Sequence, residues 1–297
     1  MGKPIIIMGL ALGACCQGLA FAEAQGFGLS HDRGFSYFLG VGRQTLHYSE
    51  EAAMVRARSS ARASSALLIT GAVYAVHPDL LVALDNTTTF APSTATESWR
   101  ATASTVPYAV SSTQIEDRAV NGPLLQTNRF SLSQSNTRVL AQYRVRGPWF
   151  WVGGLAFRSQ SFKRYRFDVL QPNVVNMPTS SVVEESSSEV LGELGLALES
   201  ERVKDVPRHY GLRLSVATPF WRRLDNTSAS DISFKGTKGW DLNLEGRYSF
   251  AINDMAHIGG WAQYAFSERG RQVKGFYELP RSQTRSTAIG IELLWKL

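Results

Sequence analysis

The chain has 297 residues, of which 44% are hydrophobic and only 19% are charged, and its formal net charge is +6. The length allows one large domain or two ordinary ones. The charged fraction lies below the roughly 25% of a typical globular protein, and the hydrophobic fraction is too high for a disordered chain. The composition therefore excludes disorder and a fibrous repeat.

The first 22 residues have the three parts of a secretory signal peptide. Lys3 gives a basic start, an apolar run follows, and Ala20 and Ala22 form an A-x-A cleavage site. We therefore expect residues 1–22 to be a signal peptide that is cleaved after Ala22. Two alternatives stay open: an uncleaved membrane anchor, and a lipoprotein box in "LGAC" with Cys15 as the acylated residue.

Both cysteines, Cys15 and Cys16, lie within this leader. A chain cleaved after Ala22 has no cysteine, so the exported protein is expected to be stable without disulfides. After the leader, no stretch offers about 18 uninterrupted apolar residues, and no spanning helix is expected. The sequence leaves a soluble exported protein or a β-barrel that crosses a membrane.

From residue 36 onward, polar and apolar residues alternate with period two, which predicts β-strands. In "WDLNLEGRYSFAI", residues 240–252, the apolar side chains share one face and the charged ones share the other. A helix would scatter these charges around its circumference. Ten strands are expected, near residues 36–48, 64–76, 80–90, 128–145, 149–161, 189–200, 209–223, 239–252, 257–268 and 286–297.

Short turns and longer polar connections alternate between these strands. The short ones hold the Pro, Gly, Asn or Asp that tight turns need, as in "HPD" at 77–79 and "NDM" at 253–255. The longer ones lie near residues 49–62, 91–127, 163–187, 225–237 and 269–284. The second of these is long enough for another hairpin, so twelve strands remain possible. No repeat or linker composition divides residues 23–297, and we expect them to form one domain.

Three features favour an antiparallel transmembrane β-barrel over a soluble β-sandwich. The predicted strands have the ten or so residues that a tilted strand needs to cross the hydrocarbon. Short turns that alternate with long loops are typical of outer-membrane barrels. Aromatic residues lie near the ends of the apolar faces, among them Trp149, Phe220 and Trp240, as in the aromatic girdles of membrane proteins.

The last stretch, "TAIGIELLWKL", also alternates, with one exception at Leu294. Its apolar face consists of Ile289, Ile291, Leu293, Trp295 and Leu297. This apolar C-terminal strand resembles the assembly signal of Gram-negative outer-membrane β-barrels. The resemblance implies a location in the cell outer membrane and insertion by the barrel assembly machinery. Unpaired strand edges cost several kcal/mol per group in lipid, so we expect this strand to pair with residues 36–48.

The inward faces of the predicted barrel carry charges of both signs. They include Arg138, Arg144, Arg158, Glu193, Arg213, Asp241, Glu245 and Arg247. A barrel of about ten strands is little wider than one filled by its own side chains. Two interpretations stay open: a salt-bridge network that fills the lumen, and a narrow charge-lined path for solutes.

Many other cations fall in the long connections, including Arg62, Arg164, Arg222 and Arg269. They are scattered over every connection, which speaks against a nucleic-acid interface. If the long loops face outward, these cations form a rim at the level of the phosphates of lipopolysaccharide. The expected partners are therefore outer-membrane lipids, lipopolysaccharide among them, and the alternative is an ordinary solvated loop surface.

The candidates for catalytic residues are His47, the one histidine placed near the long-loop side, and Asp85. A Ser-His-acid site needs three groups that converge in space. The residues show neither the Asp-His and paired-Asp sites of omptin proteases nor the His-Ser sites of outer-membrane lipases. No cluster has metal-ligand spacing and no phosphate loop follows a strand, so neither a metal nor a cofactor is expected.

The leading hypothesis is a non-enzymatic outer-membrane barrel, either a narrow porin-like channel or a surface-exposed structural or binding protein. One alternative is an outer-membrane enzyme that acts on lipid or peptide. The other is a secreted β-sandwich or lipoprotein that serves in surface assembly.

Overall fold

The computed structural model describes residues 34–111, 114–174, 182–200, 207–227, 232–275 and 277–296. The chain divides into two units, Met1–Arg33 and Gly34–Leu297, and the fold concerns the second. The expected signal peptide, with Cys15 and Cys16, lies outside the described residues, and so does Leu297. Among the described residues, no helix is long and apolar enough to span a membrane.

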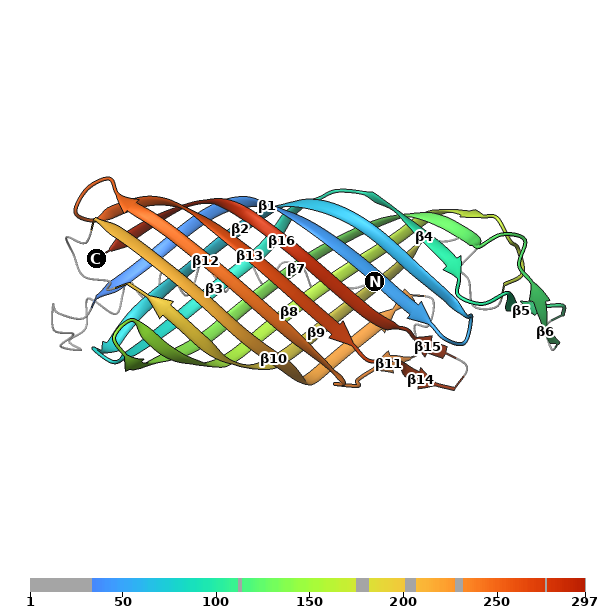
Figure 1. Ribbon diagram of the computed structural model, residues 1–297. Helices are drawn as coiled ribbons and strands as arrows, with labels where there is room; N and C mark the ends of the chain where they lie inside the picture. The colour runs from blue at the N-terminus through green and yellow to red at the C-terminus, as the bar shows by residue number, and fades with distance from the viewer. Residues whose placement is uncertain are drawn as a thin grey trace. The chain divides into compact units, whose positions relative to one another are not determined.

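Ten long antiparallel strands close into a barrel (Figure 1). They are β1 (Phe35–Ala52), β2 (Ala57–His77), β3 (Leu80–Pro92), β7 (Leu124–Arg146), β8 (Trp149–Val169), β9 (Val183–Glu199), β10 (Arg208–Asn226), β12 (Gly239–Ala251), β13 (Ala256–Arg269) and β16 (Arg281–Lys296). Their order around the ring is β1-β16-β13-β12-β10-β9-β8-β7-β3-β2, and β2 pairs with β1. The prediction of an antiparallel barrel of about ten strands is confirmed, and the ring does not contain twelve.

The shorter strands lie at the long-loop end. β4 (Ala95–Ala101) continues the line of β3 between β2 and β7 and pairs with both of these strands. β5 (Thr105–Ala109) and β6 (Ile115–Ala119) form a separate two-stranded sheet, so the region 91–127 does contain a further hairpin, but outside the ring. β14 (Gln272–Lys274) and β15 (Tyr277–Leu279) form another hairpin, and β11 (Ser233–Phe234) adds to β10.

The barrel closes where the first strand meets the last. β1 pairs with β16 from Ser36 opposite Lys296 to Glu51 opposite Arg281, which confirms the predicted partner of the C-terminal strand. The register places Tyr37 opposite Trp295, and the two rings stack with centroids 4.8 Å apart. Every main-chain group along this seam therefore finds a partner, as a wall that faces lipid requires.

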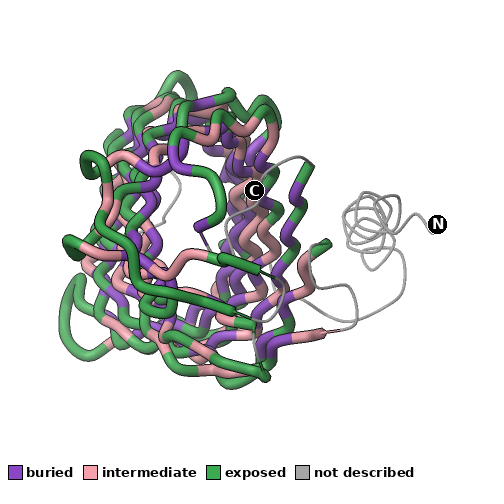
Figure 2. The backbone as a smooth tube through the Cα atoms, turned by 90° about the vertical axis from the view of Figure 1, so that its right-hand side faces the viewer, coloured by how far each residue is buried: buried purple, intermediate pink, exposed green. Residues whose placement is uncertain are grey.

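Side chains alternate between the lumen and the outer surface along each strand, and Figure 2 shows the corresponding alternation of buried and exposed residues. On β1, Tyr37, Leu39 and Val41 are exposed, whereas Phe38 is buried, and this settles the phase that the sequence left open. On β16, Leu294 breaks the pattern because it faces inward and packs in the same apolar cluster as Phe38.

The strands extend beyond the apolar band at the long-loop end. The stretch 49–62, expected as a loop, belongs to β1 and β2 apart from a turn at residues 53–56. On β7, the outward residues Val139 and Tyr143 are apolar, whereas Ser131 and Ser133 continue the same face towards the loops. A strand needs about ten residues to cross the hydrocarbon, and β7 has 23. The loop half of the barrel wall therefore stands outside the apolar band.

Two glycines at the closing seam make room for an indole inside the barrel. Gly42 pairs with Gly290 across β1 and β16, and Trp261 of β13 lies opposite Gly290 with only 5% of its surface exposed. A Cβ at Gly290 would lie 2.2 Å from the carbonyl oxygen of Val41 and 2.6 Å from the indole Nε1. The absence of side chains here allows Trp261 to cover the seam.

We expect Gly290→Ala to destabilise the barrel by about 1–3 kcal/mol, because the added methyl group must displace either backbone or the Trp261 ring. The measurement is the urea midpoint of the heat-modifiable form after refolding into lipid vesicles. Gly192→Ala is the matched control, since a Cβ at Gly192 meets no atom within 4 Å. Equal midpoints for the two variants would contradict the role given to Gly290.

Candidate functional site

Four charged side chains from four strands meet in the lumen. They are Asp85 on β3, Arg138 on β7, Arg213 on β10 and Glu245 on β12. Arg138 donates to Glu245 at 2.7 Å and to Asp85 at 3.2 Å, while Arg213 donates to Asp85 at 2.6 Å and to Glu245 at 2.9 Å. Each guanidinium thus bridges both carboxylates. Asp85 and Arg138 face each other on neighbouring strands, as do Arg213 and Glu245, whereas the bonds from Arg138 to Glu245 and from Arg213 to Asp85 join strands that are not neighbours in the wall.

Two further ion pairs extend this set towards β16. Arg247 donates to Glu245 at 2.8 Å and to Glu292 at 3.2 Å, and its guanidinium lies 3.8 Å from the ring centroid of Phe38. On the opposite side, Ser215 donates to Glu193 at 2.6 Å. We name these residues, together with the four above, the first tier of the lumen.

A second tier lies nearer the long loops. Arg269 of β13 makes two parallel bonds to Glu189 of β9, at 2.6 and 2.8 Å, and a third to Asp241 at 2.6 Å. Arg158 of β8 donates to the other oxygen of Asp241 at 2.5 Å. The Nε of Arg222 lies 2.9 Å from Glu189. Bidentate Arg–carboxylate pairs are among the strongest charge-assisted hydrogen bonds in proteins.

A third tier is built around Arg164 of β8, and carboxylates surround this arginine. Arg164 donates to Glu97 at 2.8 Å and lies 3.0 Å from Glu50. Tyr48 donates to Glu50, and Asn128 donates to Glu97 at 2.9 Å. Both carboxylates are almost completely buried, so these bonds replace the water that the charges lose.

One strand contributes an acid to every tier. β9 places Glu193 in the first tier, Glu189 in the second and Glu185 in the third, at intervals of four residues. The even spacing keeps all three on the inward face and separates them by about 13 Å along the strand. Glu185 accepts a hydrogen bond from Asn226 at 3.2 Å. The three tiers therefore repeat along the axis of the barrel.

Apolar side chains fill the lumen around the tiers. One cluster includes Val73, Leu140, Phe150 and Val152, and another includes Phe38 and Trp261. A third cluster, with Tyr48, Phe130 and Phe162, surrounds the third tier. A cavity of about 30 Å³, lined in part by Asp85, Arg213 and Glu245, lies against the first tier. It has room for little more than one water molecule.

The sequence placed eight charged residues in the lumen, and the structure brings seven of them into the first two tiers. The exception is Arg144 near the short-turn end of β7, which lies 3.5 Å from Asp79 and donates to the carbonyl of Gly147. The sequence reasoning missed Glu50 and Glu97 as lumen residues, whereas it placed Glu292 on the lumen face of the last strand, where it is buried.

It also assigned Arg164, Arg222 and Arg269 to a loop rim, and this was wrong. All three are buried in the lumen. The strands continue past the expected ends, so period two from Arg158 already pointed to an inward Arg164.

The structure does not bring His47 and Asp85 together. His47 is exposed on the outer face of β1, between Arg62 of β2 and Arg285 of β16, whereas Asp85 is buried in the first tier. Within the part of the chain that the structure describes, no group of three His, Cys, Asp or Glu residues is placed to hold a metal ion.

Comparison with known proteins gives a fold but no relative in sequence. No protein-family model matches the chain, and no curated protein does. Among solved structures, the outer-membrane protease OmpT from Escherichia coli is similar with a TM-score of 0.58 and 8% identity, over 91% of this chain and 98% of that one.

More distant matches are also outer-membrane proteins. The translocator domain of the autotransporter NalP from Neisseria meningitidis matches with a TM-score of 0.36 and 11% identity, over 96% of each chain. OprG from Pseudomonas aeruginosa matches with a TM-score of 0.32 and 12% identity, over 88% of this chain and 95% of that one. The closed ring of strands and the match to OmpT agree on the fold. The chain is a ten-stranded antiparallel β-barrel with the fold of Gram-negative outer-membrane proteins.

Proposed function

We propose that this barrel is a non-enzymatic protein with a closed lumen, which acts as a surface-exposed structural or binding protein. The observation that carries the proposal is the crossing of the lumen by ion pairs in three successive tiers. These bonds brace opposite walls of the barrel, and apolar clusters fill the space between them.

Passage of a solute would require several of these bonds to open together. Removal of one partner of a buried ion pair typically costs about 3–5 kcal/mol, since the other charge is left buried. A conducting filter works with sites that bind weakly enough to release the ion. The ion pairs in this lumen are strong and hold each other in place. Examples are the bidentate pair of Arg269 with Glu189 and the bonds that Arg138 and Arg213 share. They favour a plug over a path.

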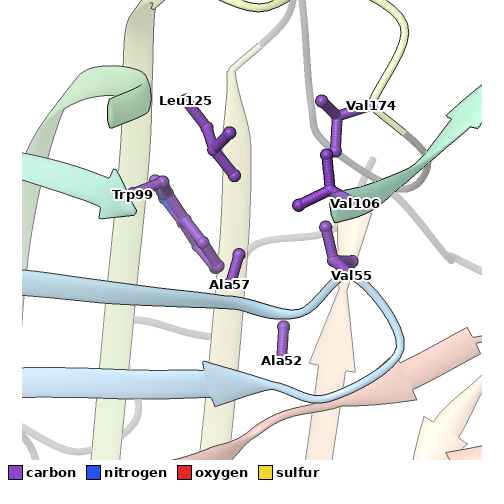
Figure 3. Packing of buried hydrophobic residues seen from close by; sticks show 7 residues of the cluster. All are labelled: Ala52, Val55, Ala57, Trp99, Val106, Leu125 and Val174. Carbon is purple, nitrogen blue, oxygen red and sulfur yellow. The ribbon is translucent and has the colours of Figure 1, made fainter. Parts of the chain in front are cut away.

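The long-loop end offers a surface fixed to the barrel. Val55, Trp99, Val106 and Leu125 belong to an apolar cluster that joins the β1–β2 turn, β4, β5 and the start of β7 (Figure 3). Arg56 donates to Asp117 of β6 at 2.8 Å. The hairpin of β5 and β6 is therefore anchored at its base, while every residue of β6 is exposed. An anchored, exposed hairpin suits a contact surface better than a free loop would.

In planar bilayers we expect the wild-type barrel to show no sustained open-channel current, because the three tiers close the lumen. The comparison variant removes the central four charges in balanced pairs: Asp85→Ala, Arg138→Ala, Arg213→Ala and Glu245→Ala. Its conductance should stay close to that of the wild type, because the second and third tiers still cross the lumen. Regular ohmic steps from the wild-type protein would overturn the closed-lumen proposal.

A single lumen arginine should matter far more for stability than an exposed one on the same strand. Arg213→Ala is expected to lower the free energy of unfolding by about 3–5 kcal/mol, because it leaves Asp85 and Glu245 short of a buried partner. Arg223→Ala should lower it by less than about 1 kcal/mol, since the pair of Arg223 with Asp225 is exposed. Urea unfolding of the vesicle-inserted barrel measures both, and similar losses would refute the assignment.

Cysteine labelling tests which end of the barrel faces the medium. In a Cys15→Ser, Cys16→Ser background, Ile115→Cys on exposed β6 should react with a membrane-impermeant maleimide on intact cells. Asp254→Cys, at the exposed short turn between β12 and β13, should react only after the cells are lysed. The reverse pattern would show that the hairpin faces the periplasm, against a surface role.

A further inference from the structure

A basic strip crosses three neighbouring strands on the outer face of the barrel. His47 of β1 lies directly opposite Arg62 of β2 on one side and Arg285 of β16 on the other. All three residues are exposed. Facing residues on adjacent strands have Cβ atoms about 5 Å apart, so two guanidinium groups and an imidazole share one small area.

Hydroxyl groups and a further arginine continue the strip towards the apolar band. Two residues before His47 on the same outer face of β1, Thr45 lies between Ser64 of β2 and Thr287 of β16. Arg43, two residues before Thr45, is exposed and has Ala66 and Ile289 opposite it. An arginine among apolar neighbours keeps its charge near the polar boundary by extending its alkyl stem. The patch therefore offers hydrogen-bond donors of two kinds beside a concentration of positive charge.

The strip lies at the long-loop edge of the apolar band that faces lipid. Ten residues separate His47 from Tyr37, whose ring stacks on Trp295 at the short-turn edge. Ten residues rise about 33 Å along a strand, and a tilt of about 40° reduces this to about 25 Å, the height of a typical apolar band. Phe266, opposite Arg285, packs against Trp240 at 4.9 Å. These aromatic rings mark the same edge.

The charge of the strip is not balanced within the protein. The two nearest acids on this face lie farther towards the loops, and each already has a partner. Glu51 is 3.7 Å from Arg58, and Glu268 is 3.0 Å from Arg281. Throughout the described ranges, no carboxylate lies within ion-pair distance of Arg43, Arg62 or Arg285. The positive charge of the strip is therefore available to an anion from outside the chain.

We propose that the strip of Arg62, His47 and Arg285, with Arg43 below it, binds the phosphate groups of a phosphorylated outer-leaflet lipid. Guanidinium groups bind phosphate in a planar, bidentate manner. Val41, Leu68 and Ile291 form the wall one row below Arg43, where the acyl chains of such a lipid would lie. This continuity of charge and apolar wall favours a lipid phosphate over a free one.

The proposal rests on the position of the barrel in the membrane and not on the closed lumen. A current through the wild-type barrel would refute the closed lumen and leave the lipid site untouched. Loss of the lipid site would likewise leave the conductance prediction as it stands. The two failures are therefore distinguishable.

Native mass spectrometry of the full-length barrel in neutral detergent micelles tests the site, with diphosphorylated lipid A as the probe. We expect the wild type to retain lipid A, and Arg62→Gln/Arg285→Gln to bind it about tenfold more weakly or worse, because charge-assisted hydrogen bonds are lost. The matched control is Arg118→Gln/Arg223→Gln, which removes the same charge from arginines that already pair with Glu116 and Asp225. Heat-modifiable migration checks that each variant is folded.

Two further arms identify the ligand. Millimolar inorganic phosphate should not displace lipid A, and phosphatidylglycerol, which carries a phosphodiester, should bind more weakly. Arg62→Lys/Arg285→Lys should give intermediate binding, because it keeps the charge and loses the planar fork. Unchanged binding by the Gln variant, an equal loss in the control, or full displacement by inorganic phosphate would overturn the proposal.

Discussion

The structure depends on one constraint: no strand edge can face hydrocarbon without its hydrogen-bonding partner. Each unpaired main-chain group in lipid costs several kcal/mol, so the sheet has to close. The seam between β1 and β16 meets this demand over sixteen facing pairs, from Ser36 to Glu51 on β1. At Gly42 and Gly290 the seam has no room for a side chain, because the Trp261 ring lies over the two strands from inside the barrel. Closure in turn creates the lumen, and the lumen has to be filled.

The filling combines apolar clusters with three tiers of ion pairs, and the ionic part is an unusual solution in energetic terms. Burial of a charge costs several kcal/mol even after relaxation, and a buried pair recovers this only with good geometry and additional hydrogen bonds. Arg213 and Arg138 share the same two carboxylates, and Arg269 satisfies two acids at once. Because the bonds of Arg138 with Glu245, Arg213 with Asp85 and Arg269 with Glu189 join strands that are not neighbours, the network fixes which walls face each other. The lumen is thus a brace as well as a plug.

The outer surface of the barrel changes in polarity along the strands. Near the short turns it is apolar and anchored by aromatic rings such as Tyr37 and Trp295. Towards the loops it becomes polar, and the strip around His47 marks the change. Beyond that edge the strands continue into a region with its own apolar cluster around Trp99, which holds the exposed hairpin of β5 and β6. Membrane contact, lipid contact and surface display therefore follow one another along the same strands.

Period two by itself determined much of this protein. It identified the strands and the inward side of residues such as Arg213 and Glu245. Strand and loop lengths then indicated the antiparallel barrel, and the cost of an open edge indicated the partner of the last strand. Local pattern suffices for the strands and their inward faces because adjacent residues of a strand must point to opposite faces. It could also have placed Arg164 inside, had the strands been followed beyond the length that the membrane requires.

Only the tertiary structure decided which charges meet. Arg138 and Glu245 are 107 residues apart, and their contact depends on the number of strands and the register around the ring. The same holds for His47, whose neighbours Arg62 and Arg285 come from opposite ends of the chain. The sequence states on which face a side chain lies. Its partner across a lumen or a strand is set by closure, because closure alone fixes the distances between strands that are remote in the chain.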